Sequence, residues 1–333
     1  MRVVAAPDKL RGTASATQVA GAIARGAAAQ GWVCAQVPMA DGGEGTLEAL
    51  GGANRTTTVT GPLGAPVEAA WRLAPSTDGQ VTAVIEMARA SGIQLVGGPE
   101  GNDPVAASTA GTGELIAAAL DVGATRIIVG VGGSASTDGG LAALRALHPR
   151  GRLRGIELLV ACDVRTGFVD AADVFAAQKG ATEAQVKLLR RRLERLSQVY
   201  LAEHGLDVNA LEGAGAAGGL AGGLAAVGAR LLSGFDVVAD EVQLYEHLEG
   251  ADLVITAEGF LDAQSFEGKV VGGVAALAAE AGVPVVAIAG QVFDGMGDRI
   301  HAVSLVERFG EERARSDTAR CIESVTAGLL AGR

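Results

Sequence analysis

The stretch Arg126–Leu147 reads RIIVGVGGSASTDGGLAALRAL, and its pattern recurs through much of the chain. The run of branched apolar residues predicts a buried strand over Arg126–Val131, and the Ala- and Leu-rich run predicts a helix over Gly139–Leu147. A glycine-rich turn that contains an aspartate joins the two. Buried apolar strands that alternate with helices are typical of a parallel sheet in an α/β protein.

The same alternation extends in both directions from this stretch, and one set of strands interrupts it. Three short strands with a Gly-Pro turn between the first two, Thr56–Thr60, Val67–Leu73 and Val81–Glu86, have the pattern of antiparallel neighbours. We therefore predict two domains, a Rossmann-like domain of residues 1–54 and 251–333 and an inserted α/β domain of residues 55–250. The remaining predicted strands are Arg2–Ala6, Val33–Val37, Glu157–Ala161, Leu253–Thr256 and Val283–Ala289, and the remaining predicted helices are Ser15–Gln30, Glu44–Leu50, Gly113–Leu120, Glu183–Glu203, Gly218–Leu231, Val270–Ala281 and Asp317–Leu330.

The composition restricts the partners. The 333 residues include 38 acidic and 27 basic side chains, which give a formal net charge of -11. This excess of acid argues against nucleic acid or an anionic membrane as a partner, because both bind basic surfaces. The one dense basic run, Arg190–Arg192, falls within a predicted helix and is interpreted as a solvated face.

The cysteines and the apolar runs indicate a cytoplasmic protein. Cys34, Cys162 and Cys321 are too few and too scattered for a disulfide framework or a zinc site. The N-terminal apolar run is too short for a signal peptide. The longest apolar stretch, Gly272–Gly290, contains Glu280 and a proline, so it predicts a helix followed by a strand and not a membrane span.

Acidic residues follow five of the predicted strands: Asp8, Asp41, Asp138, Asp163 and Glu258. Ligands of open parallel sheets bind beyond the carboxyl ends of the strands, where turns expose backbone N–H groups. A single aspartate at such a place is usually a helix cap. Five acidic strand ends, three of them interleaved with glycine, favour a site that holds phosphate groups, and we expect these side chains to gather around one pocket.

Several other enzyme classes lack their sequence signatures. The loose dinucleotide pattern at Gly130–Ala135 lacks an acidic residue at the end of the next strand, and the similar pattern at Gly213–Gly218 has no strand before it. A dinucleotide-dependent oxidoreductase stays open as a weaker alternative. There is no P-loop around Gly268-Lys269, and no Ser–His hydrolase motif. The carboxylates and glycine-rich turns suit a magnesium–nucleotide and the deprotonation of an alcohol.

At these segments the sequence resembles the bacterial glycerate kinase family of the first type. The resemblance implies ATP-dependent phosphorylation of D-glycerate with Mg²⁺, 2-phosphoglycerate being favoured over 3-phosphoglycerate as the product. It also implies a Rossmann-like domain that carries a second α/β domain, with the active site in the cleft between them. The segments that carry the resemblance follow the family order along the whole chain, and they are Ala6–Thr13, Pro38–Thr46, Gly111–Leu115, Gly130–Gly140, Ala161–Val164, Gln178–Ala181, Gly213–Leu224 and Glu258–Asp262.

The reaction requires a base, a metal site and cations, and we assign candidates to each. Asp163, or failing that Asp8, is the hypothesised base, because Asp163 directly follows an apolar strand and burial would raise its pKa. Asp41 and Glu44, three residues apart at a predicted helix start, are the candidate magnesium ligands, although a helix start favours acidic residues without any metal. Arg11 and Lys179 are candidate anion binders, Arg11 at the reacting groups and Lys179 at the nucleotide. The other assignments are Gly132, Gly133, Ser134, Asp138, Gly139 and Gly140 for the nucleotide, and Glu258 and Asp262 for the substrate.

The sequence departs from the family pattern at several positions. Arg11 replaces a lysine, Phe260 replaces an arginine, and Thr166-Gly167 replaces an Asn-Pro pair. Asn102 also replaces an arginine, and the segment between Leu147 and Ile156 is shorter than usual. The loss of cations keeps a second interpretation open, in which the chain is a divergent or degenerate member with another substrate.

Overall fold

The computed structural model describes residues 1–75 and 79–332, which form two compact units. Unit 1 comprises Met1–Asp41, Glu48–Leu50 and Gly234–Arg333, and unit 2 comprises Gly42–Leu47 and Gly51–Ser233. Unit 2 is therefore an insertion in the sequence of unit 1. In the ranges described, no helix combines the length and the apolar character needed to span a bilayer.

Unit 1 is built on a parallel five-stranded sheet with the order β11-β10-β9-β1-β2. When only the strands of this unit are counted, that order is the doubly wound order 2-1-3-4-5. The winding reverses between β1 and β9, and ligands of such sheets bind outside the carboxyl ends of the two strands at the reversal. The strands are β1 (Arg2–Ala5), β2 (Val33–Gln36), β9 (Leu253–Leu261), β10 (Val285–Val292) and β11 (His301–Ser304).

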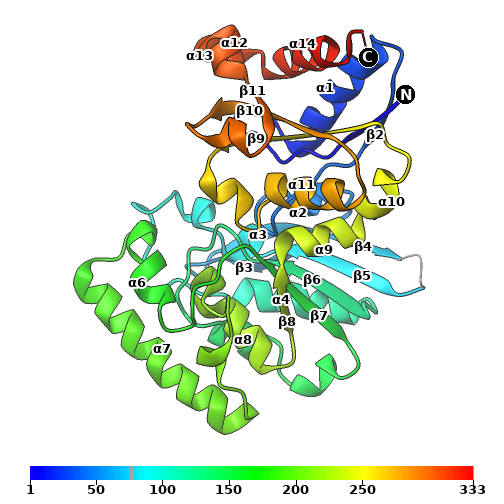
Figure 1. Cartoon of the computed structure of the whole chain (residues 1–333). Helices are drawn as coiled ribbons and strands as arrows, with labels where there is room; N and C mark the ends of the chain where they lie inside the picture. The colour runs from blue at the N-terminus through cyan, green and yellow to red at the C-terminus, as the bar shows by residue number, and fades with distance from the viewer. Residues whose placement is uncertain (76–78, 333) are drawn as a thin grey trace. The chain divides into compact units, whose positions relative to one another are not determined.

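Alternate residues of these strands pack against helices on both faces of the sheet. Val3 and Ile255 belong to a core with α1 (Ala16–Ala28) and α14 (Thr318–Leu330), which lie side by side, blue and red in Figure 1. Their strand neighbours Val4 and Val254 belong to a core on the opposite face. The helices of that face are α9 (Gly234–Glu241), α10 (Leu244–Leu248) and α11 (Val270–Glu280), and the short helices α12 (Leu305–Phe309) and α13 (Glu311–Ser316) complete the first face.

Unit 2 contains a mixed six-stranded sheet in which the strands follow chain order. The strands are β3 (Arg55–Thr60), β4 (Pro66–Pro75), β5 (Val81–Glu86), β6 (Arg126–Gly130), β7 (Glu157–Cys162) and β8 (Arg230–Ser233). The first three are antiparallel, and β5 to β8 are parallel. Glu86 pairs with Gly130, and Gly130 pairs with Ala161, so the carboxyl ends of three strands lie level at one edge.

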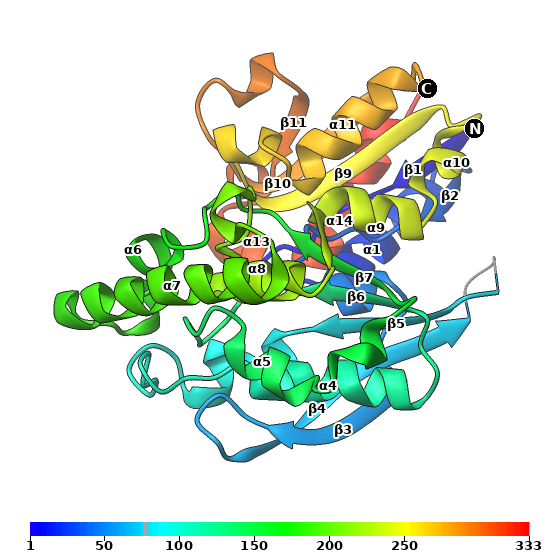
Figure 2. The same ribbon diagram turned by 90° about the horizontal axis from the view of Figure 1, so that it is seen from below.

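One face of this sheet carries a large apolar core. Ile127, Val129 and Val160 pack there with apolar residues of the surrounding helices, and Figure 2 shows two of these helices, α4 and α5, next to each other. The helices are α3 (Ala88–Ser91), α4 (Ala110–Asp121), α5 (Leu141–Ala146), α6 (Ala171–Phe175), α7 (Glu183–His204) and α8 (Leu220–Ala226).

The structure confirms the predicted α/β class with parallel sheets and most of the predicted elements, and it corrects several details. The helix predicted over Gly218–Leu231 ends at Ala226, and Arg230–Ser233 forms β8. Helix α2 (Thr46–Ala49) begins two residues after the predicted Glu44. The strand β11 and the helices α9 and α10 lie in segments for which no element was predicted, and α9 and α10 belong to unit 1.

Candidate functional site

Asp8 lies just beyond the carboxyl end of β1, at the strand pair where the winding of unit 1 reverses. Its backbone N–H donates to Ala257 O of β9 at 2.8 Å, which holds it beside that strand. Lys9 donates its backbone N–H to Asp8 Oδ1 at 2.7 Å, and its ammonium lies 3.6 Å from the same oxygen. Burial raises the pKa of Asp8 to about 6, with the charge of Asp41 adding to the rise and Lys9 opposing it.

Glu258 lies on the neighbouring strand β9 and has a similarly perturbed carboxyl group. Burial raises its pKa to about 7, and the charge of Asp8 contributes to the rise while that of Lys269 opposes it. Its Oε1 is buried and has no hydrogen-bond partner. Asp8, Asp41 and Glu258 therefore interact as one acidic group within unit 1, at the place where a doubly wound sheet binds its ligand.

The other predicted residues of unit 1 have less specific surroundings. Asp262 caps a short 3₁₀ turn by accepting from the N–H groups of Gln264 at 2.8 Å and Ser265 at 3.2 Å. Arg11 is exposed. The predicted substrate role of Asp262 and the predicted anion-binding role of Arg11 stay predictions.

The predicted magnesium ligands precede helix α2 and do not lie within its first turn. Asp41 is half-buried in unit 1, whereas Glu44 is exposed and belongs to unit 2. Over residues 1–75 and 79–332, no three or more His, Cys, Asp or Glu side chains are grouped so that they could hold a metal ion. The assignment of Asp41 and Glu44 as magnesium ligands stays a prediction.

Glu86, at the carboxyl end of β5 in unit 2, was not among the predicted site residues. It is 3% exposed, and its Oε1 accepts from the N–H groups of Gly45 at 2.9 Å and Leu47 at 2.8 Å. Its other oxygen accepts from Arg89 Nε at 3.1 Å. Glu86 thus holds the Gly-rich segment Gly42–Leu47 in place. An acidic residue at a strand end was the signal that could have identified it.

Lys179, at the end of a 3₁₀ turn that follows α6, is a buried cation that reaches the loop after β6. Its ammonium donates to Ser134 Oγ at 2.7 Å and to Ser136 O at 2.6 Å. Burial lowers its pKa to about 7, although the carboxylate of Asp138 opposes this change. The side chain of Asn102 donates to the carbonyls of Ala135 and Lys179, so it fixes the two segments together.

Asp138 joins the starts of two helices. Its Oδ2 accepts from Thr109 N at 3.0 Å and from Thr109 Oγ1 at 2.8 Å, and its Oδ1 accepts from Gly140 N at 3.0 Å. Burial raises the pKa of this carboxyl, and these hydrogen bonds oppose the rise. These contacts give Asp138 an observed structural role, and its predicted nucleotide contact stays a prediction.

Close packing explains most of the glycines of the same loop. A Cβ atom on Gly139 would lie 2.4 Å from Leu196 Cδ2, and one on Gly132 would lie 2.7 Å from Gly43 Cα. Gly133 differs, because its φ of +71° requires glycine although its nearest neighbour, Ala88 Cβ, would be 3.5 Å away. The predicted nucleotide contact of Gly133 stays a prediction.

Asp163 does not have the surroundings on which its prediction depended. It follows β7 as expected, but it is exposed, so the expected burial of this carboxyl is wrong. The pKa of the neighbouring Cys162 is raised to about 11, mainly by burial of its thiol and next by the negative charge of Asp163. Among the predicted acidic residues, Asp8 and Asp41 lie in unit 1, and Asp138 and Asp163 follow adjacent parallel strands of unit 2.

Comparison with known proteins gives a family for the whole chain. The model of the glycerate kinase family matches residues 3–151 and 148–330. A glycerate 2-kinase of Escherichia coli is 41% identical, over 89% of this chain and 87% of the relative. A glycerate kinase of Bacillus subtilis is 40% identical, over 88% of this chain and 85% of the relative.

A solved structure leads to the same family as these relatives. A crystal structure assigned as glycerate kinase 2 from Salmonella typhimurium superimposes with a TM-score of 0.83 at 35% identity. The superposition covers 99% of this chain and 97% of that one. The family match and the relatives each cover far more than half of the chain. This chain therefore belongs to the glycerate kinase family, and it is a kinase.

Proposed function

We propose that this protein transfers the terminal phosphoryl group of ATP to D-glycerate, with Mg²⁺, and that the product is 2-phosphoglycerate. The observation that supports this best is the pair of perturbed carboxyl groups, Asp8 and Glu258, at the reversal point of the unit 1 sheet. The similarity to the Escherichia coli glycerate 2-kinase supports the choice of hydroxyl.

Asp8 is the base in this proposal, and Asp163 is the alternative. A carboxylate with a pKa of about 6 is ionised at neutral pH, and it is a stronger base than an ordinary aspartate. Asp8 accepts the proton of the glycerate hydroxyl as the oxygen attacks the phosphoryl group. Asp163 is exposed, so it lacks the burial for which it was predicted to be the base.

Cations and carboxylates of the chain complete the site. Arg11, which is exposed and follows β1 closely, binds the carboxylate of glycerate with its guanidinium. Glu258 accepts hydrogen bonds from substrate hydroxyls through its unpartnered Oε1, with Asp262 nearby in sequence. In unit 2, the loop Gly132–Gly140 and Lys179 contact the nucleotide.

Asp41 and Glu44 hold Mg²⁺ in this proposal. Their carboxylate oxygens are the donors that magnesium prefers, and two protein ligands leave positions for water and phosphate. When bound, the ion neutralises charge on the β- and γ-phosphates of ATP.

The direct test is ADP release from Mg–ATP in the presence of D-glycerate. L-Glycerate and a reaction without acceptor are the controls. We expect ADP release only with D-glycerate, and ³¹P and ¹³C NMR spectra of the product showing phosphate on carbon 2. Absence of ADP release above the controls would overturn the kinase proposal, and phosphate on carbon 3 would overturn the choice of hydroxyl alone.

A second candidate is a divergent kinase for another hydroxy acid, and one observation favours it. Phe260, which replaces an arginine of the family, is 53% exposed and contacts Phe293, with ring centroids 6.3 Å apart. This pair presents an apolar surface two residues after Glu258. We would compare D-glycerate with D-lactate and longer 2-hydroxy acids in wild type and in Phe260→Arg. If the natural substrate is D-glycerate, Phe260→Arg should raise kcat/KM for D-glycerate several-fold. A preference of the wild type for an apolar 2-hydroxy acid would instead support the second candidate.

A further inference from the structure

A cavity of about 790 Å³ lies between α5 and α7 of unit 2. Its walls are mostly aliphatic, and Leu141, Leu144, Leu193 and Leu196 are among the side chains that line it. Apolar walls and a volume of this size are typical of sites that bind small molecules. These leucines have no part in the phosphoryl transfer proposed above.

The chain is shortened at the rim of this cavity. The family model matches residues 3–151 and 148–330 as two pieces, so the match is interrupted at His148, which lines the cavity. The alignment with the Escherichia coli relative extends over 336 residues but uses only 89% of the 333 residues of this chain, so that relative has residues without a counterpart here. The apolar lining is not fully covered by the chain itself, because Leu188 is 40% exposed.

The shape of the cavity favours a flexible chain over a peptide helix as its occupant. The α7 side of the lining runs from Leu188 to Glu203, which is about 22 Å along the helix axis. The volume divided by this length gives a mean cross-section of about 36 Å². A helix with its side chains is about 10 Å across and needs roughly 80 Å². An extended hydrocarbon chain is narrow enough for this space, and a peptide helix is not.

One stripe of α7 is cationic, although the chain as a whole carries a net charge of -11. Lys187, Arg191 and Arg195 follow one another at intervals of one helical turn, and all three are exposed. Arg191 and Arg195 line the cavity. Within the part of the chain that the structure describes, no carboxylate is paired with any of the three. Like charges four residues apart destabilise a helix, and an anion bound between them relieves this repulsion.

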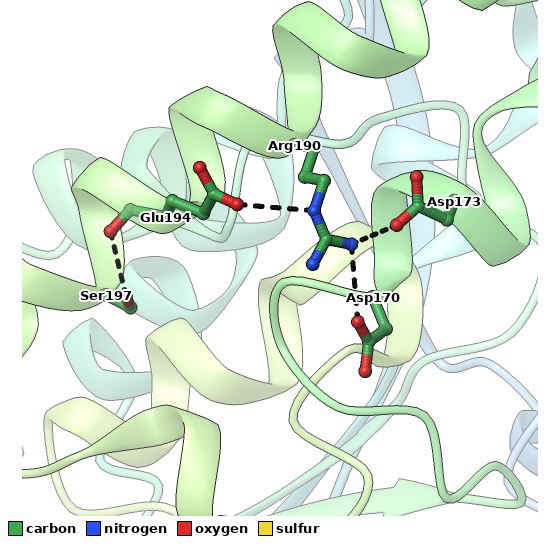
Figure 3. Close-up of polar contacts among 5 residues, drawn as sticks. All are labelled: Asp170, Asp173, Arg190, Glu194 and Ser197. Carbon is green, nitrogen blue, oxygen red and sulfur yellow. Dashed lines mark hydrogen bonds and ion pairs between the residues drawn. The ribbon is translucent and has the colours of Figure 1, made fainter.

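Arg190, which precedes Arg191, shows the opposite arrangement on the same helix. Glu194 lies one turn later, with its Oε1 3.2 Å from Arg190 Nε. Asp170 and Asp173 also pair with this guanidinium, as Figure 3 shows. The chain itself therefore compensates the charge of Arg190. Arg191 has a second arginine one turn later, so a carboxylate that compensates its charge would come from a ligand.

The inner wall of the cavity carries no free charge. Asp138 lines it, but its oxygens accept hydrogen bonds from Thr109 and Gly140. Tyr200 also lines it, and its hydroxyl donates to Gly139 O at 2.9 Å. With these polar groups satisfied inside the protein, the inner wall presents mainly apolar surface to an occupant.

A second acidic residue of the lining lies away from the arginine stripe. Glu203 comes eight residues after Arg195, which places it about 12 Å farther along α7, and it has an interaction partner of its own. Arg195 uses Nη1 for Gln198 Oε1 at 3.1 Å and keeps its other donors for a ligand. Arg145 of α5 adds a third exposed guanidinium to the lining.

We infer that this cavity binds one molecule of a carboxylic acid with a long apolar tail, whose carboxylate lies between Arg191 and Arg195. Charge-assisted hydrogen bonds from the guanidinium groups hold the carboxylate. The tail lies along the leucines and removes their apolar surface from water. The inference does not depend on the proposed function, because this binding needs neither ATP nor glycerate.

Calorimetry with dodecanoate, below its critical micelle concentration, tests the site. We expect one dodecanoate to bind per chain. Hexanoate has the same carboxylate and a tail shorter by six methylene groups, so it should bind at least about 100-fold more weakly. Dodecyltrimethylammonium has the same tail with a cationic head group, and it should not bind because the arginines repel it.

Substitutions at exposed positions test the two ends of the ligand without disturbing the core. Arg191→Ala and Arg195→Ala should each weaken dodecanoate binding about tenfold. Leu188→Asp places a carboxylate on the apolar lining and should weaken it at least about tenfold. Arg154→Ala removes an exposed cation of unit 2 outside the cavity, so it is the matched control and should bind as wild type does. The melting temperature of each variant shows that it is folded.

The inference is overturned if dodecanoate does not bind to wild type, if hexanoate or the cationic amphiphile binds as tightly, or if both arginine variants bind as wild type does. It is also overturned if a second copy of the chain covers the cavity, which size-exclusion chromatography would show as a wild-type dimer that Leu188→Asp converts to a monomer. A chain that binds dodecanoate in the expected pattern but makes no phosphoglycerate would refute the proposed function only. Normal turnover in a chain that does not bind dodecanoate would refute this inference only.

Discussion

Asp8 and Asp163 occupy the same kind of place, within three residues of the end of an apolar strand, and yet their surroundings differ. Asp8 is largely buried beside β9 and has a pKa of about 6, whereas Asp163 is exposed. The sequence identifies both as strand-end carboxylates. It does not reveal which segments cover each strand end, because that depends on contacts between residues far apart in the chain. The same limit applies to Glu258, whose perturbed carboxyl depends on its closeness to Asp8.

The first prediction concerns Asp8 and its titration. Asp8→Asn should lower kcat about 100-fold or more, which is the usual contribution of a general base. In wild type, kcat/KM should rise with pH and level off above about pH 6, because only the ionised carboxylate accepts the proton. The pH profile of ADP release checks this.

Asp163→Asn is the matched control for Asp8→Asn, since both remove one strand-end carboxylate. We expect it to keep most of the wild-type turnover and the same pH profile. The reverse result, with turnover lost in Asp163→Asn and kept in Asp8→Asn, would return the role of base to Asp163.

At the scale of elements, the sequence predicts best where local interactions decide the structure. Helix α7 was predicted at Glu183–Glu203 and ends one residue later, because a capping box between Thr182 and Gln185 starts it and Gly205 follows its end. The first two residues of Arg230–Ser233 were predicted as the end of the helix Gly218–Leu231, because they continue an Ala- and Leu-rich run. The segment forms β8 because it pairs with β7, a contact that has no local signal.

Glu86 gives a prediction about the segment before α2. Glu86→Ala would leave the N–H groups of Gly45 and Leu47 without their acceptor, so the free energy of unfolding should fall by about 3 kcal/mol. Urea denaturation measures this change. Glu280→Gln, at an exposed end of α11, is the control and should alter stability by less than about 0.5 kcal/mol. A Glu86→Ala protein as stable as the control would contradict the role of this carboxylate.

Two glycines of the loop after β6 give a paired prediction. Gly139→Ala combines a positive φ with a contact of 2.4 Å to Leu196, so it should destabilise the protein by about 3 kcal/mol. Gly133→Ala has the positive φ but enough space, so it should cost only about 1 kcal/mol. Thermal unfolding of both variants gives the comparison, and equal losses would show that packing at Gly139 is not the cause.

At the scale of the whole molecule, the antiparallel strands in an otherwise parallel pattern were the signal for an inserted unit. Unit 2 has its own sheet and its own core, so a fragment of residues 42–233 should fold alone. We expect cooperative urea unfolding of this fragment and a far-ultraviolet circular dichroism spectrum of mixed helix and strand. A matched fragment cut at residue 210 would lose α8 and β8 and serves as the unfolded control. A non-cooperative transition for residues 42–233 would contradict the independence of unit 2.

The chain has two tryptophans, and each lies in the core of a different unit. Trp32 is 6% exposed in unit 1, and Trp71 is 2% exposed in unit 2, where its indole donates to Thr57 Oγ1 at 2.9 Å. Each indole can therefore serve as a natural fluorophore for one half of the molecule. Emission from Trp32→Phe reports the melting of unit 2, emission from Trp71→Phe reports that of unit 1, and no dye has to be attached.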